Sequence, residues 1–260
     1  MVIVNNNELN TKVMGNKIIH FDTIESTNDY AKKIGYDEKE GTVIISETQT
    51  NGRGRLGRQW SSKQGEGIYM SIILKPDIEI NKTPFLTLIA GASIVKVLND
   101  LGIDALIKWP NDIILNSKKI GGILSELCTH YDKLDYIVVG IGINVKNIDF
   151  PKEISDIATS LYKEGYDISK DYIVNQILCE FERLYFEYID NNYKKNTLDI
   201  CKDYSAIINK DIYIFNNNKQ ELVKCVDINE DGNLIIETKY NEIKEIISGE
   251  VSIRGVKGYI

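Results

Sequence analysis

The sequence has 260 residues, of which 43% are hydrophobic and 27% charged, the balance of a globular chain with one large core and a small second domain. A formal net charge of −7 argues against a general nucleic-acid or membrane-surface binder. No stretch approaches the roughly 18 apolar residues that a membrane-spanning helix needs. The N-terminus lacks a signal-peptide pattern, and the four cysteines lack the spacing of a zinc site. We therefore expect a cytoplasmic protein with no protein-bound metal and no membrane partner.

The first part of the chain alternates strand and helix patterns. Ser26 is a good N-cap, since its hydroxyl can accept an early backbone N–H of the helix that follows. The long apolar run from Thr83 to Leu101 carries hydrophobic residues on most faces and stops at Gly102, which is typical of a buried helix. In chain order the patterns predict a helix from Ser26 to Gly35, strands at 42–46 and 67–75, and the buried helix.

The middle of the chain is rich in β-branched residues and then becomes helical again. The run LDYIVVGIGINV is hydrophobic enough for a central strand. We predict strands at 105–110, 111–116, 118–128 and 134–145, followed by helices at 155–165 and 169–192.

After about residue 205 the pattern changes to short alternating runs, at 211–215, 221–228, 233–239 and 245–255. The Asp-Gly pair in NEDGN at 229–233 predicts a hairpin turn, and the spacing predicts a small β-barrel. The expected fold is thus α+β, with a mixed sheet flanked by helices. We place the boundary so that residues 1–205 form a catalytic domain and residues 206–260 form the barrel.

Residues 51–60, NGRGRLGRQW, combine three glycines with three arginines in an acidic chain and predict a site for a bound anion. Gly52, Gly54 and Gly57 also match the dinucleotide pattern G-x-G-x-x-G. That pattern must open a helix, whereas a strand is predicted after this loop, so a Rossmann enzyme is disfavoured. A plain surface turn is the remaining structural alternative.

Three further motifs are weak one by one. In KWPND at 108–112, packing of Trp109 and an Asn-Asp turn are sufficient explanations. In KKIGGILSE at 118–126, an edge hairpin explains Lys118, although Lys119 is harder to dismiss. In ESTNDYA at 25–31, helix capping explains one of the three polar residues but not all of them.

Taken as an ordered set, STN, Q-x-x-GRGRLGRQW, KWPND, KKIGGILSE and GIGIN resemble the biotin protein ligases, in their catalytic and C-terminal domains. The resemblance covers nearly the whole chain and implies a class II synthetase-like fold. Only 25 residues precede Ser26, so we expect a monofunctional ligase without the N-terminal DNA-binding domain and without a DNA partner.

The resemblance implies a reaction in two steps. Biotin and ATP, the latter as its Mg²⁺ complex, give biotinyl-5′-AMP and pyrophosphate. A lysine of biotin carboxyl carrier protein, a part of acetyl-CoA or pyruvate carboxylase, then takes the biotinyl group. No enzyme nucleophile is required, which agrees with the lack of a Ser/His/Asp or Cys/His constellation. A homodimer is one expectation, although the sequence does not determine the oligomeric state.

The resemblance also implies roles for individual residues. The catalytic residues would be Lys119, Arg53 and Arg55. Biotin would contact Ser26, Thr27, Asn28, Gln49, Arg53, Gly54, Arg55 and Lys119. ATP would contact Gly52, Arg55, Arg58, Trp60, Asn111 and Asn144, with residues 145–155 covering the adenine and Phe150 as a ring contact. Because clustered cations repel one another, we expect residues 51–60 to be mobile without an anion.

Two alternatives stay open. One is a lipoate or octanoate ligase or transferase of the same fold, but its His-Asp pair is missing, since His20 precedes Phe21 and His130 precedes Tyr131. The other is a non-catalytic biotin sensor. The presence of Lys119 and the arginines favours catalysis over this second alternative.

Overall fold

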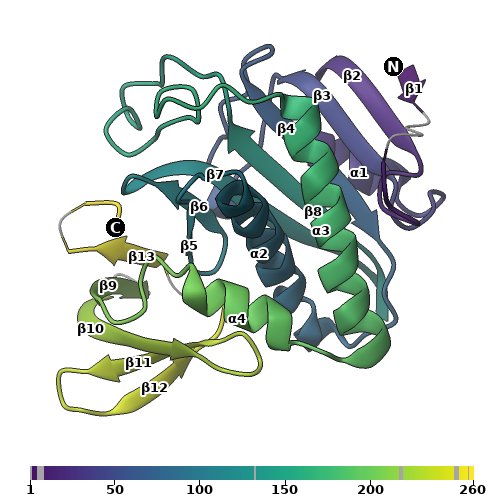
Figure 1. Cartoon of the computed structure of the whole chain (residues 1–260). Helices are drawn as coiled ribbons and strands as arrows, with labels where there is room; N and C mark the ends of the chain where they lie inside the picture. Colours follow the sequence, from purple (N-terminus) through teal and green to yellow (C-terminus); the bar gives the residue numbers. More distant parts are fainter. Residues whose placement is uncertain (1, 5–8, 132, 217–218, 249–251, 257) are drawn as a thin grey trace.

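The computed structural model describes residues 2–4, 9–131, 133–216, 219–248, 252–256 and 258–260. Its centre is an eight-stranded sheet in the order β1-β2-β3-β4-β8-β7-β6-β5 (Figure 1). In that order the strands are β1 (Val2–Val4), β2 (Ile18–Ile24), β3 (Val43–Gln49), β4 (Gly67–Leu74), β8 (Lys133–Asn144), β7 (Lys118–His130), β6 (Asp112–Leu115) and β5 (Leu106–Lys108). Only β2 and β3 are parallel, while the other neighbours are antiparallel. The predicted mixed sheet is therefore confirmed.

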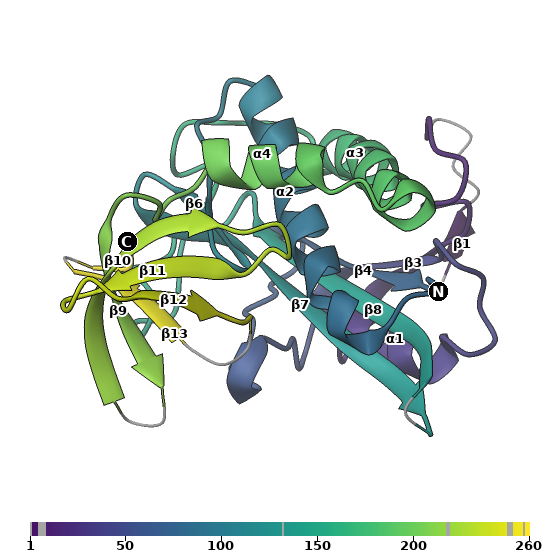
Figure 2. The same ribbon diagram turned by 90° about the horizontal axis from the view of Figure 1, so that it is seen from below.

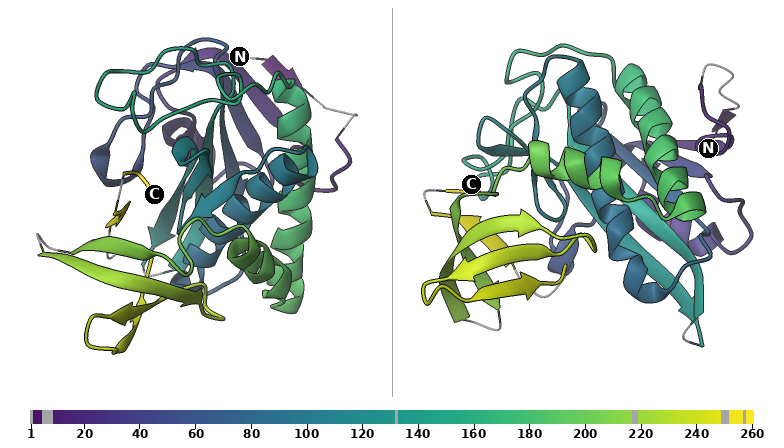
Figure 3. Two further views of the ribbon diagram at one scale, coloured as in Figure 1. Left: turned by 60° about the vertical axis from the view of Figure 1, so that its left-hand side comes forward. Right: turned by 60° about the horizontal axis from the view of Figure 1, so that its bottom comes forward.

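Helices cover both faces of this sheet (Figures 1 and 3). They are α1 (Thr27–Ile34) on one face and α2 (Pro84–Asp100) and α3 (Lys170–Asn191) on the other, while α4 (Lys195–Asp203) packs mainly against α2. Strand β4 is buried along its whole length because alternate side chains enter two cores. Ile73 packs with Ala31 of α1, whereas Ile72 and Leu74 belong to the large core that includes α2 and α3.

The helix boundaries follow local chemistry. Ser26 has extended backbone angles, and its hydroxyl accepts the backbone N–H of Asp29 at 3.3 Å, so the predicted N-cap of α1 is confirmed. Helix α2 starts with Pro84 and is followed by Gly102 at φ +75°, and most of its side chains are buried. Helix α4 was not predicted, because it is short and its buried face holds only Thr197, Leu198 and Cys201.

A second sheet has five antiparallel strands in the order β12-β11-β10-β9-β13 (Figure 2). They are β9 (Asp211–Asn216), β10 (Lys219–Ile228), β11 (Leu234–Thr238), β12 (Ile243–Ile246) and β13 (Ser252–Gly255). Within the described residues β12 and β13 are the outer strands and do not pair with each other, so the sheet is open and the predicted small β-barrel is not formed. The turn at 229–233 joins β10 to β11 as predicted. Residues 249–251 of the predicted run 245–255 lie outside the described residues.

The two sheets are tied together by direct contacts. The indole N–H of Trp109, in the KWPND motif, donates to the carbonyl of Gly232 at 2.8 Å. Gly232 lies against Leu88 of α2, at φ +82° in the Asp-Gly turn. Helix α4 packs against α2 and β10 (Figure 2). The boundary at residues 205/206 stays a prediction, and it falls between α4 and β9.

One predicted helix is wrong. Residues 155–165 form turns instead, because several of their backbone groups bond to residues of the central strands and so interrupt a helical series of hydrogen bonds. Lys119 N–H donates to the carbonyl of Ile157 at 2.8 Å, and Thr159 N–H donates to the carbonyl of Lys119 at 3.0 Å. Leu161 is buried in the main core and Ile157 packs against it, and a periodic pattern does not reveal whether such residues belong to a helix or to turns. Among the helices in the described part of the chain, none is both long and apolar enough to cross a membrane.

Candidate active site

Two adjoining cavities lie beside the loop of residues 51–60, and the first of them lies over the middle strands β4, β8 and β7 of the central sheet. The first, here called the polar pocket, has about 460 Å³ of empty space that is open to solvent, and it is lined by the Ser26–Asn28 turn, Gln49 and strands β7 and β8. The second, called the large cavity, has about 1180 Å³ of empty space that is open to solvent, and it lies between KWPND, residues 150–158 and the C-terminal segment. Five residues line both: Gly54, Arg55, Trp60, Asn111 and Lys119. We call this set the shared wall.

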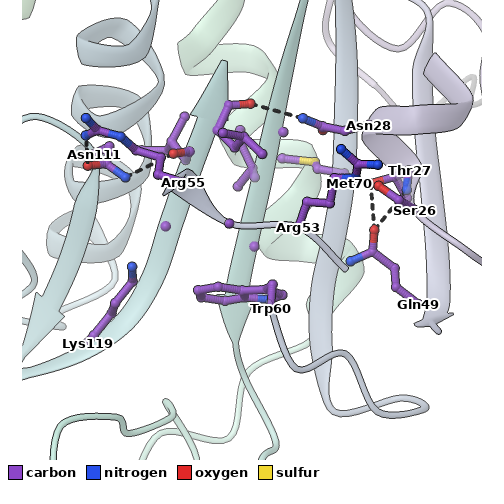
Figure 4. Close-up of a pocket in the computed structure, with 17 residues that line it drawn as sticks. Ser26, Thr27, Asn28, Gln49, Arg53, Arg55, Trp60, Met70, Asn111 and Lys119 are labelled. Carbon is purple, nitrogen blue, oxygen red and sulfur yellow. Dashed lines mark hydrogen bonds between the residues drawn. The ribbon is translucent and has the colours of Figure 1, made fainter. Parts of the chain in front are cut away.

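The polar pocket is built from side chains that fix one another's orientation (Figure 4). Gln49 Oε1 accepts the backbone N–H of Thr27 at 2.9 Å and its hydroxyl at 3.1 Å, while Gln49 Nε2 donates to Ser62 at 2.8 Å. Ser71 Oγ lies 2.8 Å from Thr27 Oγ1. Such a network holds polar atoms in a defined arrangement, as a specific ligand pocket requires.

Asn28 forms the far end of the polar pocket. Its amide nitrogen donates to Glu126 Oε2 at 2.8 Å and to the carbonyl of Leu124 at 3.2 Å, and its Oδ1 accepts from Ser71 at 2.6 Å. The side chain reaches this position only because residue 140 is glycine. A Cβ at Gly140 would lie 2.1 Å from Asn28 Oδ1, so no other residue fits without movement.

Trp60 lies across the strands beneath the loop (Figure 4). A Cβ at Gly142 would lie 2.6 Å from its ring, so the second glycine of GIGIN allows the indole to approach the sheet. Its Nε1 is buried and has no hydrogen-bond partner among the described residues. Because an unpaired buried donor is costly, this N–H is suited to a ligand acceptor.

The three arginines of the loop have different environments. Arg55 turns inward and donates to Asn111 Oδ1 at 2.6 Å, and burial, together with the neighbouring Arg58, lowers its pKa. Arg53 lines the polar pocket but pairs with Asp29 Oδ2 at 2.7 Å and is half-exposed. Arg58 is exposed at the large cavity. The structure thus separates three arginines that the sequence treats as one cluster.

Lys119 is held at the shared wall by Asp112. Its Nζ lies 2.5 Å from Asp112 Oδ1 and 5.5 Å from the centre of the Trp60 ring. Strand β6 pairs Ile113 with Gly121 and Ile114 with Lys119, which leaves a bulge on β7. A bulge redirects side chains, so this irregularity contributes to the direction in which Lys119 points.

Asp112 is the acidic centre of the large cavity. Burial alone would favour its protonated form, but the charge and hydrogen bond of Lys119, the Tyr259 hydroxyl and Lys108 outweigh burial and hold the Asp112 pKa below its ordinary value. Lys108 is 3% exposed, and burial lowers its pKa to about 7. The large cavity therefore combines one carboxylate with several cationic groups.

The structure brings most of the predicted site residues together. Ser26, Thr27, Asn28 and Gln49 line the polar pocket, and Arg58 and Asn144 line the large cavity. Asn144 donates to the carbonyl of Thr159 at 3.0 Å, and Phe150 also lines the large cavity. Gly52 belongs to the loop but lines neither cavity, and a Cβ there would meet the Trp60 carbonyl at 2.5 Å. The roles of these residues stay predictions.

Several residues of the site were not predicted: Lys108, Asp112, Ser71, Glu126, Arg254 and Tyr259. Lys108 and Asp112 lie in KWPND, so that motif was sufficient to suggest them. Ser71 and Glu126 sit at strand positions that support Asn28. Arg254 and Tyr259 come from the C-terminal segment and have no sequence signal that links them to this site.

Comparison with known proteins identifies the class. Residues 20–144 match the Biotin/lipoate A/B protein ligase family, and residues 218–254 match the Biotin protein ligase C terminal domain. The family match, together with the fold and its adjoining polar and cationic cavities, identifies the class of protein as a ligase.

Individual relatives narrow the class. The bifunctional ligase/repressor BirA of Bacillus subtilis is 38% identical, covering 94% of this chain and 76% of that protein. BirA of Escherichia coli is 27% identical over 98% of this chain and 79% of its own length. The structure of biotin protein ligase from Aquifex aeolicus in complex with biotin and ATP has a TM-score of 0.80 and 31% identity, covering 92% of this chain and 98% of that one. The chain belongs to the biotin protein ligase family.

Proposed function

We propose that biotin binds in the polar pocket, that ATP binds in the large cavity, and that the two react at the shared wall. The observation that carries this proposal is that Lys119 and Arg55, two cations, line both cavities. A carboxylate in one cavity and an α-phosphate in the other would meet at these side chains. The Aquifex aeolicus relative, whose structure contains biotin and ATP, supports the assignment of the two ligands.

The first step is an electrostatic problem. A carboxylate oxygen of biotin attacks the α-phosphorus of ATP, and pyrophosphate leaves. Two unit negative charges 4 Å apart repel by about 1 kcal/mol in water and about 4 kcal/mol at an effective dielectric constant of 20. Lys119 and Arg55 would offset that repulsion, and Arg53 would join them if it moved away from Asp29. Fixed cations aimed at developing charge are a large source of catalysis.

The polar pocket suits the ureido ring of biotin. A urea carries both donors and acceptors on a mostly apolar bicycle, and Ser26, Thr27, Asn28, Gln49 and Gly54 supply groups of both kinds. Lipoate has no urea and could make none of the hydrogen bonds that a ureido ring can form with these groups. Such mismatches reject a ligand more strongly than shape alone.

The nucleotide side uses groups of a different kind. We propose that Arg55 and Arg58 bind the phosphates and that the side-chain amides of Asn111 and Asn144 bind polar atoms of the nucleotide. The backbone around Gly52 would allow the loop to close. Trp60 and Phe150 would supply ring contacts. Mg²⁺ would enter as part of the substrate, bound to the ATP phosphates.

In the second step the amine of a carrier-protein lysine attacks the acyl carbon of biotinyl-5′-AMP, and AMP leaves. The acceptor would be the biotin carboxyl carrier protein of acetyl-CoA or pyruvate carboxylase. The related enzyme of Mycobacterium tuberculosis, named biotin–[acetyl-CoA-carboxylase] ligase, supports that choice at 32% identity over 149 residues. A homodimer, a cytoplasmic location and the absence of a DNA partner stay predictions.

The deciding experiment is ATP–pyrophosphate exchange measured side by side with biotin and with lipoate. Biotin should support exchange, whereas lipoate at the same concentration should not exceed the rate without any acid. Exchange with lipoate alone would overturn the substrate assignment. Exchange with biotin but no biotinylation of a carrier protein would support the proposed first step and contradict the proposed acceptor.

A further inference from the structure

The C-terminal segment reaches into the large cavity through Tyr259. Its side chain is buried, and its hydroxyl donates to Asp112 Oδ2 at 2.5 Å. The other oxygen of the same carboxylate, Oδ1, accepts from Lys119 Nζ at 2.5 Å. The carboxylate of Asp112 thus connects Tyr259 of the C-terminal segment to Lys119 at the shared wall.

The rest of Tyr259 contacts a second lysine. Lys108 Nζ donates to the Tyr259 carbonyl at 2.9 Å and lies 3.7 Å from the centre of the phenol ring. The guanidinium carbon of Arg254 lies 5.2 Å from the same centre. These contacts fix the ring independently of the hydroxyl, so removal of the hydroxyl alone should leave the segment in place.

The two hydrogen bonds on Asp112 restrict how its carboxylate can turn. With one donor on each oxygen, neither oxygen can leave its place without losing a charge-assisted bond. Burial and the neighbouring Asp112 raise the pKa of Tyr259, so the phenol keeps its proton and stays a donor. Without that donor, Asp112 would be free to rotate toward other cations in the cavity, and Lys119 would lose its fixed partner.

We propose that Tyr259 is a positioning residue for Lys119, which acts through Asp112 and makes adenylate formation depend on the contact of the C-terminal segment with the central sheet. The inference rests on the proposed role of Lys119 in the first step. Tyr259 itself needs no contact with biotin or the acyl group.

Tyr259→Phe tests this inference because it keeps the ring and the carbonyl and removes only the hydroxyl. We expect kcat of biotin-dependent ATP–pyrophosphate exchange to fall about tenfold and KM for biotin to stay within twofold. Tyr240→Phe is the matched control, since that tyrosine is 71% exposed in the turn between β11 and β12, and its exchange should equal that of the wild type. An unchanged kcat in Tyr259→Phe would overturn the inference, and so would a faster one, which would mean that the tyrosine obstructs the nucleotide.

A double-mutant cycle separates positioning from general damage. Adenylate formation is measured in single-turnover reactions, followed for hours so that slow variants still give a rate. If Tyr259 acts through Lys119, the tenfold effect of Tyr259→Phe should disappear in the Lys119→Ala background. The same tenfold loss in both backgrounds would overturn the inference. A Lys119→Ala rate equal to wild type would instead overturn the proposed role of Lys119 in the first step.

Discussion

Arg53 and Asp29 join the glycine and arginine loop to the helix that begins with the STN motif. Arg53 Nε lies 2.7 Å from Asp29 Oδ2, and Lys32 Nζ lies 3.0 Å from Asp29 Oδ1. Lys32 in turn binds Glu126 at 2.6 Å, the carboxylate that also accepts from Asn28. A chain of charges therefore runs from the loop, across the start of α1, to the far end of the polar pocket.

Asp29→Asn should loosen this loop. A partly exposed ion pair contributes up to about 1 kcal/mol, so its loss should raise the open population of the loop by up to about fivefold. Amide hydrogen exchange of residues 51–60 should become faster by that factor without ligands. Asp100→Asn, which breaks the exposed i,i+4 pair with Lys96, should leave those amides unchanged.

The same measurement checks whether anions order the loop. With biotin and ATP bound, residues 51–60 should exchange more slowly in the wild type, because the ligands offset the repulsion among the arginines. Equal protection with and without ligands would contradict this expectation.

Lys119→Ala and Lys118→Ala form a matched pair. Lys119 lies at the shared wall, and loss of a fixed cation at a developing charge should slow biotinyl-adenylate formation by about 10²-fold or more. Lys118, its neighbour on β7, lines neither cavity and should change the rate by less than about twofold, as most surface substitutions do. Single-turnover rates of adenylate formation are measured for both variants. Small, equal effects would contradict the assignment of Lys119.

Gly140→Ala should impair biotin binding. The added Cβ would lie 2.1 Å from Asn28 Oδ1, so Asn28 must move and lose hydrogen bonds at the far end of the polar pocket. One lost buried hydrogen bond costs about 1–3 kcal/mol, and we expect KM for biotin to rise about tenfold or more. Gly91→Ala in α2 is the control, because its Cβ would meet neighbouring side chains at an ordinary 3.7 Å. Equal KM values for the two variants would contradict the proposed place of the ureido ring.

Lys108 should make folding stability depend on pH. Burial lowers its pKa from 10.5 to about 7, so between these values the unfolded chain binds a proton that the folded chain does not. Stability therefore rises with pH through this window, and the penalty for burying the charged lysine is full only below about pH 7.

Lys108→Met removes this titration. From pH 7 to pH 9 the free energy of unfolding of the wild type should increase by about 2 kcal/mol more than that of the variant. Denaturant titrations at several pH values measure both proteins. The lost hydrogen bond to Tyr259 adds an offset that does not change with pH, so parallel curves would show that Lys108 is charged across the whole window.

Local patterns carried much of the prediction. The cap at Ser26, the buried helix α2, the strands around the loop and the Asp-Gly turn were predicted because each depends on residues close in sequence. The family motifs predicted the polar pocket for the same reason, since Ser26, Thr27 and Asn28 occupy one turn. The predictions of a helix at 155–165 and of a barrel were wrong. The structure of those segments depends on strand ends and sheet edges that lie far away in sequence.

By itself, the sequence determined which groups are available: a capped polar turn, a loop of glycines and arginines, and a lysine beside paired glycines. The tertiary structure decided what each group contacts. Arg53 pairs with Asp29 instead of lying beside Arg55. Asp112 accepts a hydrogen bond from Tyr259, which is 147 residues away in the chain. Hydrogen bonds and ion pairs depend on atoms within a few ångströms, and such distances between remote residues arise only when both sheets have folded and packed.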